Sequence, residues 1–232
     1  MPKTLLIFDI DDTLTQTAAI HIQAFIKSLN ELGVEKMDTN FGEYLHHTDS
    51  YVSKTIYEKE MWQPFSEQKK AQFEKLLSNK MAEEQINETP GASHFIKQAS
   101  KNTSIAICFA TGSLRRPAIQ KLQSIGVDFD DQLLVASDRL LKRESIVKKA
   151  IEQAKGYYGV SHFDRIISIG DGLWDLKAAN NLKVEFVGVG LKNKSALMEQ
   201  GCTKHLDDFR NVSLVQLLNQ PSTLSDSFRY VS

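Results

Sequence analysis

The sequence predicts an α/β protein built on a parallel β-sheet. Five short apolar runs have the length of strands and are bounded by acidic, glycine or serine residues: 4–9, 104–110, 132–136, 165–169 and 184–189. Most are rich in Ile, Val, Leu or Phe without polar alternation, which is typical of strands buried on both faces. Helical patterns lie between the later runs. Strands that alternate with helices favour a parallel sheet with right-handed crossovers.

The helical patterns are read from the spacing of apolar residues. Ile119, Leu122 and Ile125 recur at helical intervals after Pro117, a residue suited to a first helical turn. Residues 145–154 and 174–182 have the same periodicity, and a further helix is expected to follow the Thr89-Pro90-Gly91 turn. Each pattern falls between two apolar runs, as a sheet with crossover helices requires.

The connection between the first two strands is much longer than the others. From about residue 14 to residue 88 no strand pattern occurs, and two amphipathic helices are indicated instead. Their apolar residues are Ile22, Phe25, Ile26, Leu29 and Leu32 in the first, and Phe73, Leu76, Leu77 and Met81 in the second. A crossover of this length indicates an inserted helical domain. We therefore expect a core of residues 1–14 and 89–220, a helical insertion of residues 15–88, and a Ser- and Thr-rich tail at 221–232.

The composition argues against a nucleic-acid-binding, membrane-spanning or disulfide-rich protein. The formal net charge of −1 over 232 residues gives no electrostatic reason to expect nucleic-acid or membrane binding. No apolar run approaches the roughly 20 residues that span a bilayer, and the short first run ends in acids, unlike a signal peptide. Two cysteines, Cys108 and Cys202, are too few for a disulfide framework. We expect a cytoplasmic protein, monomeric by default although a dimer is possible.

Polar residues follow four of the predicted strands at the point where each strand ends. In open parallel sheets, ligands bind outside the carboxyl ends of the strands, so these side chains are expected to meet at one edge. They are Asp9 and Asp11 after the first run, Thr111 and Gly112 after the second, Lys142 and Arg143 after the third, and Asp171 and Asp175 after the fourth.

These groups suit phosphoryl transfer assisted by Mg²⁺. A hard dication prefers oxygen ligands, which Asp9, Asp171 and a backbone carbonyl near Asp11 can supply. Thr111 and the Gly112 N–H can hold phosphate oxygens, because glycine permits close backbone approach. Asp9 is the better candidate for the nucleophile, which leaves Asp11 to protonate the leaving alcohol and later to activate water.

The same residues carry a resemblance to the haloacid dehalogenase superfamily. Its first motif, DxDxT, is matched by residues 9–13, its second by Thr111, and its fourth, GDxxxD, by Gly170, Asp171 and Asp175. The resemblance implies a Rossmann-like, three-layer core. It also implies that Asp9 is the nucleophile and Asp11 the general acid and base, that Thr111 contacts phosphate, and that Asp171 and Asp175 bind the metal with Asp9 and Asp11.

The third motif of this superfamily is a lysine, usually followed by proline, and here the match is looser. The segment reads Leu-Lys-Arg-Glu-Ser at 141–145, without proline. Lys142 is the expected catalytic and phosphate-binding cation because it precedes the helix predicted from residue 145. Arg143 and Lys148 are the alternatives.

The long insertion occupies the position of the helical C1 cap found in the phosphoglycolate-phosphatase and β-phosphoglucomutase branch. We therefore expect a Mg²⁺-dependent phosphatase that hydrolyses a small phosphorylated metabolite through an aspartyl-phosphate on Asp9. The acid at Asp11 favours phosphomonoester chemistry, because the superfamily's dehalogenases lack it and its transporting ATPases have threonine there. A sugar phosphomutase, or a low-turnover protein that binds a phosphorylated ligand, remains the alternative.

Overall fold

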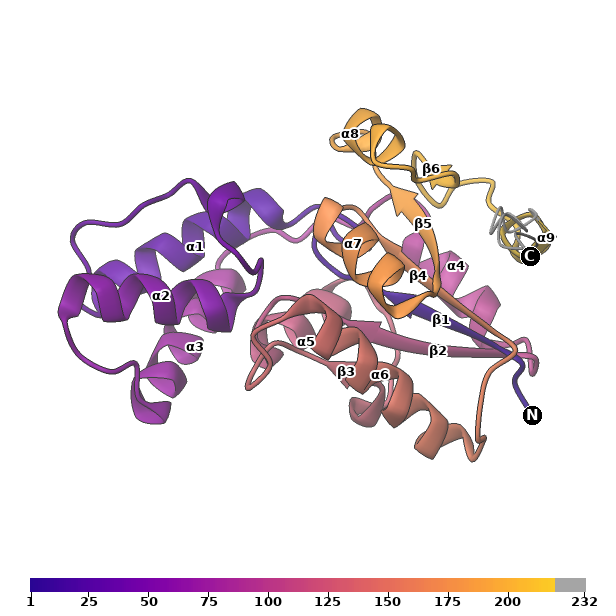
Figure 1. Cartoon of the computed structure of the whole chain (residues 1–232), viewed down its shortest axis with the longest axis horizontal. Coiled ribbons are helices and arrows are strands. Elements are labelled where there is room, and N and C mark those ends of the chain that lie inside the picture. Colours follow the sequence, from indigo (N-terminus) through magenta and orange to yellow (C-terminus); the bar gives the residue numbers. More distant parts are fainter. Residues whose placement is uncertain (220–232) are drawn as a thin grey trace, which may run out of the picture.

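The computed structural model describes residues 1–219 and has one parallel sheet at its centre (Figure 1). The strands lie in the order β3-β2-β1-β4-β5-β6. They are β1 (Thr4–Phe8), β2 (Ile105–Ala110), β3 (Leu134–Val135), β4 (Arg165–Gly170), β5 (Glu185–Val189) and β6 (His205–Leu206). All five predicted runs contain a strand. The two-residue β6 at the edge was not predicted.

Helices cover both faces of the sheet, so the core has three layers. Along β1 the side chains alternate between two apolar clusters: Leu6 and Phe8 pack on one face, and Leu5 and Ile7 on the other. A strand places neighbouring side chains on opposite faces, so an unbroken apolar run fills both layers. The predicted α/β fold is thereby confirmed.

The flanking helices are α4 (Ala92–Ser100), α5 (Arg115–Ser124), α6 (Arg143–Tyr158), α7 (Leu173–Leu182), α8 (Lys194–Glu199) and α9 (Leu214–Asn219). Four of them, α4 to α7, occupy segments where the sequence predicted a helix, and α8 and α9 were not predicted. Residues of α4 and α5 pack with Phe8, whereas residues of α6 pack with Ile7 on the opposite face. The main difference from expectation is the start of α6, which lies at Arg143 and therefore earlier than residue 145.

Residues 17–87 form a group of helices beside the sheet, here called the helical lobe (Figure 1). It contains α1 (Ala18–Glu31), a 3₁₀ turn at Phe41–Glu43, α2 (Asp49–Met61) and α3 (Glu67–Ala82). The lobe has its own apolar core, in which the rings of Phe25 and Phe73 meet edge to face at 5.0 Å. The sequence indicated α1 and α3 but not α2. The predicted tail at 221–232 lies outside the described residues.

The segment by which the chain enters the lobe, residues 14–16, lies beside the segment by which it leaves, residues 87–89. The amide of Gln16 donates to the carbonyl of Asn87 at 2.8 Å, and the amide of Thr89 donates to the carbonyl of Leu14 at 2.9 Å. The entering crossing lies a few residues after Asp9 and Asp11 in sequence, and these hydrogen bonds bring the returning segment alongside it, so the lobe begins just after the acids that follow the first strand.

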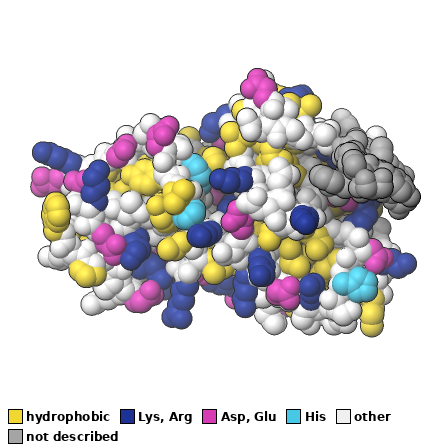
Figure 2. All heavy atoms as spheres, viewed as in Figure 1, with side chains coloured by type: hydrophobic (Ala, Val, Ile, Leu, Met, Phe, Trp, Pro, Cys, Tyr) yellow, Lys and Arg dark blue, Asp and Glu magenta, His cyan; other side chains and the backbone are white. Residues whose placement is uncertain are grey.

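Charged side chains of both signs are interspersed over the face seen in Figure 2, on the lobe and on the sheet domain alike. This mixture agrees with the formal net charge of −1. Among residues 1–219, no helix has both the length and the apolar character needed to cross a membrane.

Candidate active site

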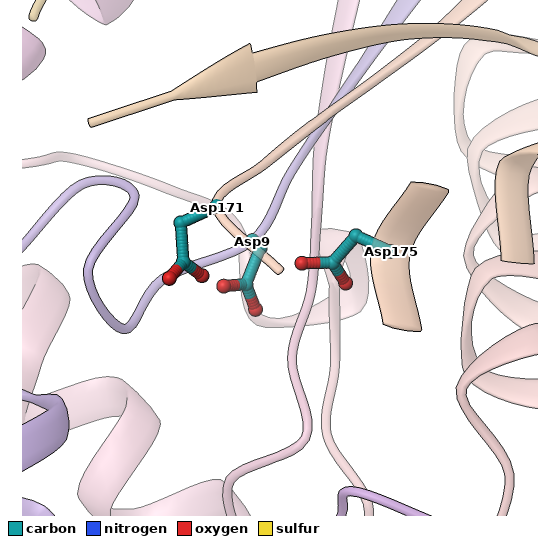
Figure 3. A group of neighbouring side chains, drawn as sticks. All are labelled: Asp9, Asp171 and Asp175. Atoms are coloured by element: carbon teal, nitrogen blue, oxygen red, sulfur yellow. The ribbon is translucent and has the colours of Figure 1, made fainter. Parts of the chain in front are cut away.

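Three carboxylates meet at the carboxyl edge of the sheet (Figure 3). Asp9 follows β1, Asp171 follows β4, and Asp175 lies in the first turn of α7. All three are buried, and one oxygen from each lies within 4.8 Å of the others. β1 and β4 are hydrogen-bonded neighbours with Phe8 beside Ile169, so each strand presents its acid at the same level. The structure therefore brings together three of the four predicted metal-binding residues.

Arg143 lies against this cluster. As the first residue of α6 it is almost fully buried, and its Nε donates to Oδ1 of Asp175 at 2.7 Å. Its Nη2 donates to Oδ1 of Asp9 at 2.5 Å. Its Nη1 is buried without a hydrogen-bond partner in the described part of the chain. Arg143 also lines the cavity above Asp9, and an unpartnered guanidinium N–H group beside a cavity suits an anionic ligand.

Lys142 lies elsewhere. It is the N-cap residue of α6, with extended backbone angles, and its side chain is exposed and does not line the cavity. Lys148 is exposed as well. The structure thus places the alternative, Arg143, where Lys142 was expected. The physical reason is that α6 begins earlier than predicted. Its first residue, Arg143, points into the protein, and the preceding residue, Lys142, faces solvent.

Asp9 and Asp171 are in an environment that opposes their ionisation. Burial raises the pKa of Asp9 to about 7, although the positive charge of Arg143 acts in the opposite direction. Burial also raises the pKa of Asp171 well above its ordinary value, and the neighbouring charges of Asp9 and Asp175 add to the effect. The positive charge of Arg143 therefore does not offset the effect of burial on these two acids.

Asp11 points away from the three carboxylates and toward α5. Its Oδ1 lies 2.6 Å from Nζ of Lys121, a lysine with 0% exposure, and its Oδ2 accepts from Ser113 at 2.7 Å. Thr17 donates to Oδ1 at 2.7 Å. Burial alone would raise the pKa of Asp11, but the charge of Lys121 and the hydrogen bonds from Lys121 and Thr17 hold it well below its ordinary value.

The residues present fit a bound divalent cation. Within residues 1–219, the buried cations that contact these acids are Arg143 and Lys121, so four carboxylates face two positive charges. The carboxylates are Asp9, Asp11, Asp171 and Asp175. A dication would balance the remaining negative charge, and the oxygen ligands are those that Mg²⁺ prefers. Asp11 could contribute only through its backbone carbonyl, because its side chain faces Lys121.

A cavity of about 260 Å³ opens above Asp9 and is bounded by the sheet edge and the helical lobe. Thr111, with 0% exposure, and Gly112 line it. A Cβ at Gly112 would lie 2.7 Å from the carbonyl oxygen of His47 and 2.9 Å from Nη1 of Arg143. Glycine is required here because the lobe and the arginine both approach its backbone.

The sequence itself identifies the family. A family model described as haloacid dehalogenase-like hydrolase matches residues 6–189, which include all the predicted motifs. The chain belongs to this family. The resemblance read from the motifs is therefore confirmed, and the chain is a haloacid dehalogenase-like hydrolase.

Solved structures share the fold of this hydrolase at low sequence identity. CbbY from Rhodobacter sphaeroides in complex with phosphate has 20% identity and a TM-score of 0.69, over 91% of this chain and 96% of that one. A predicted phosphoglycolate phosphatase from Haemophilus somnus has 17% identity and a TM-score of 0.60, over 90% and 95%. A putative β-phosphoglucomutase from Thermotoga maritima has 17% identity and a TM-score of 0.60, over 94% and 100%. The comparison with curated proteins gave no match.

The helical lobe contributes a mostly apolar wall to the cavity of the hydrolase. Five of its lining residues are Ala18, Ile22, Phe25, Phe41 and Val52. The ring of His47 stacks on the indole of Trp174 from α7, with centroids 4.6 Å apart. His47 thereby joins the lobe to the sheet domain beside the cavity.

Sequence reasoning missed Lys121. A lysine in a helical segment is usually solvent-exposed, and nothing in its chemistry alone marks it as buried. One signal was present: Ala118, Lys121, Leu122 and Ile125 have the i, i+3, i+4, i+7 spacing of a buried helix face. A charged residue at such a position indicates a buried partner, which here is Asp11.

Proposed function

We propose that this haloacid dehalogenase-like hydrolase is a Mg²⁺-dependent phosphatase that hydrolyses a small phosphomonoester through an aspartyl-phosphate on Asp9. The observation that carries the proposal is the setting of Asp9. Its carboxylate is buried at the base of the cavity, lies with two further carboxylates, and is held by Arg143, whose Nη1 is free to bind an anion. A nucleophilic carboxylate beside an anion-binding arginine suits attack on a phosphoryl group.

In the first half-reaction, a carboxylate oxygen of Asp9 attacks phosphorus and the bond to the alcohol oxygen breaks. Thr111, the Gly112 N–H and Arg143 hold the non-bridging oxygens. Asp11 gives a proton to the leaving alcohol from its protonated form, which its low pKa makes the minor form. Mg²⁺ bound by Asp9, Asp171 and Asp175 would supply positive charge to the transferring phosphoryl group. The predicted role of Lys142 as the cation passes to Arg143 in this proposal.

In the second half-reaction, Asp11 takes a proton from a water molecule. The oxygen of that water attacks phosphorus, which releases phosphate and restores Asp9. The helical lobe acts as the cap predicted for residues 15–88, and its apolar wall excludes bulk water from the reacting atoms.

The lining of the cavity favours a monophosphate with an apolar remainder. Of the described residues that the lobe contributes to the lining, none is Lys or Arg. Lys192, on the sheet-domain side, lies 3.3 Å from Asp12 and is largely exposed. A sugar bisphosphate needs a cation for its second phosphate. This favours phosphatase over phosphomutase activity.

The test is turnover of p-nitrophenyl phosphate with and without Mg²⁺. We expect metal-dependent release of phosphate that is lost in Asp9→Asn, whereas the exposed residue Asp164 provides the control variant Asp164→Asn with wild-type activity. A phosphomonoester panel would then rank apolar against sugar substrates. Isomerisation of hexose phosphates with a bisphosphate activator would support the mutase instead. An absence of turnover across the panel would favour the ligand-binding alternative.

A further inference from the structure

Lys121 is a fully buried lysine next to Asp11, and each N–H group of its ammonium has a hydrogen-bond partner. It lies on α5 with 0% exposure. Its Nζ is 2.6 Å from Oδ1 of Asp11, 2.8 Å from Oγ of Ser113 and 2.9 Å from Nδ1 of His21. An ammonium has three N–H donors and no acceptor, so each donor has one partner.

The directions of these hydrogen bonds form a consistent network. His21 accepts from Lys121 at Nδ1, so its Nε2 carries a hydrogen and donates to Oδ1 of Asp49 at 2.9 Å. Ser113 accepts from Lys121 and donates to Oδ2 of Asp11. Lys121 therefore contacts one oxygen of Asp11 directly and the other through Ser113.

The network also reaches the helical lobe. His21 lies on α1, and Asp49 lies at the start of α2. Asp49 accepts from the amide of Leu114 at 2.8 Å, and its own amide donates to the carbonyl of Gly112 at 2.8 Å. The two residues that support Lys121 from the lobe side are therefore fixed where the lobe meets the sheet domain.

We propose that Lys121 is a positioning residue that fixes the carboxylate of Asp11 for proton exchange with the leaving oxygen of the substrate. His21 and Asp49 hold Lys121 in place from the lobe. The inference rests on the proposed function, because Asp11 has this role only in a phosphomonoester hydrolase. Lys121 does not line the cavity, so it acts through Asp11 and does not touch substrate.

This role has a signature that a purely structural role lacks. The value of kcat/KM reports the steps up to phosphoryl transfer to Asp9, in which Asp11 protonates the leaving group. A p-nitrophenolate leaves without a proton, whereas an alkoxide needs one, so loss of the acid harms alkyl esters most. Disturbing Asp11 therefore changes the ratio of kcat/KM for an alkyl phosphate to kcat/KM for p-nitrophenyl phosphate. A general loss of structure lowers both values by the same factor.

The experiment measures kcat/KM for p-nitrophenyl phosphate and for an alkyl phosphate in the full-length protein with Mg²⁺. We expect Lys121→Met to lower the alkyl value by about 100-fold and the p-nitrophenyl value by less than about threefold, the pattern also expected for Asp11→Asn. The control is Arg116→Met, which removes an exposed cation from the same helix and should leave both values unchanged.

A second comparison remains informative if Lys121→Met alone does not fold. Asp11→Asn/Lys121→Met removes both charges of the pair and so leaves no buried charge unpaired. We expect it to match Asp11→Asn within about twofold on both substrates, because Lys121 acts only through Asp11. An equal loss on both substrates in Lys121→Met, or a further loss in the double variant, would overturn the role. A wild-type protein that turns over neither p-nitrophenyl phosphate nor any member of the phosphomonoester panel would instead contradict the proposed function.

Discussion

The guanidinium of Arg143 and the carboxylate of Asp9 form a buried ion pair, with Nη2 2.5 Å from Oδ1. The same guanidinium donates through Nε to Asp175, so one side chain joins the first and fourth motifs. A planar fork of donors is suited to two acceptors at once, which the ammonium of a lysine reproduces less well. Several properties of the site follow from this pair.

Arg143→Ala should reduce the turnover of p-nitrophenyl phosphate by about 100-fold or more, because it removes the cation beside the transferring group. Lys142→Ala is the matched control, since its side chain is exposed one residue earlier, and should retain activity within about twofold. Steady-state kinetics of the two variants compare these effects directly. The reverse order would restore Lys142 as the cation of the third motif.

Gly112→Ala should lower kcat/KM, because the new Cβ would lie 2.7 Å from the carbonyl oxygen of His47 and 2.9 Å from Nη1 of Arg143. Gly156→Ala is the control within a helix: nothing lies within 4 Å of a Cβ at this exposed position in α6. It should raise the free energy of unfolding by about 0.5–1 kcal/mol without affecting activity. Normal kinetics in Gly112→Ala would mean that the lobe and the arginine can move apart at no cost.

Stability of the metal-free protein should fall as the pH rises from about 4 to about 7. The pKa of Asp9 is about 7 in the folded protein against an ordinary 3.8, so in this window the folded state binds a proton that the unfolded state has lost. Asp9 therefore lowers the free energy of unfolding by its full amount above about pH 7 and has no such effect below about pH 4. Thermal unfolding in a chelator measures this trend, and Asp9→Asn should weaken it.

Mg²⁺ should then raise the melting temperature more at about pH 8 than at about pH 5, because a cation binds the ionised carboxylates of Asp9 and Asp171 and competes with their protons. Melting curves with Mg²⁺ and with chelator at both pH values test this. Equal shifts at both pH values would indicate that the cation binds away from this cluster.

Trp174 should report on the junction between the lobe and the sheet domain. The chain has two tryptophans, and the other, Trp62, is 91% exposed, so Trp62→Phe isolates the Trp174 signal and should leave activity unchanged. In that background, His47→Ala should shift the emission of Trp174 to longer wavelength, because it removes the ring that covers the indole. An unchanged spectrum would mean that the stack does not persist in solution.

Much of the fold and of the acid cluster could be predicted from the sequence. Uninterrupted apolar runs that end in acids or glycine define the strands, and parallel topology brings their ends to one edge. This is why Asp9 and Asp171 meet although they are far apart in the chain. The edge strand β6 could not be predicted, because two half-buried residues carry no periodic signal.

The cations were harder to predict, for two different reasons. Lys142 and Arg143 are neighbours of the same charge, and the choice depends on the residue at which α6 begins, which apolar periodicity locates only within a few residues. Lys121 is buried by tertiary contacts with Asp11, Ser113 and His21 rather than by local pattern. Both depend on where a side chain points, which spacing alone determines poorly.

The most direct test of the central claim is capture of the phosphoryl group on Asp9. Wild-type protein would be mixed rapidly with p-nitrophenyl phosphate and Mg²⁺, quenched in acid and digested with trypsin. We predict a hydroxylamine-sensitive phosphoryl group on the peptide of residues 4–27, located at Asp9 by fragmentation and absent from Asp9→Asn. Steady turnover with no modified peptide, or a phosphoryl group at another residue, would contradict the nucleophilic role of Asp9.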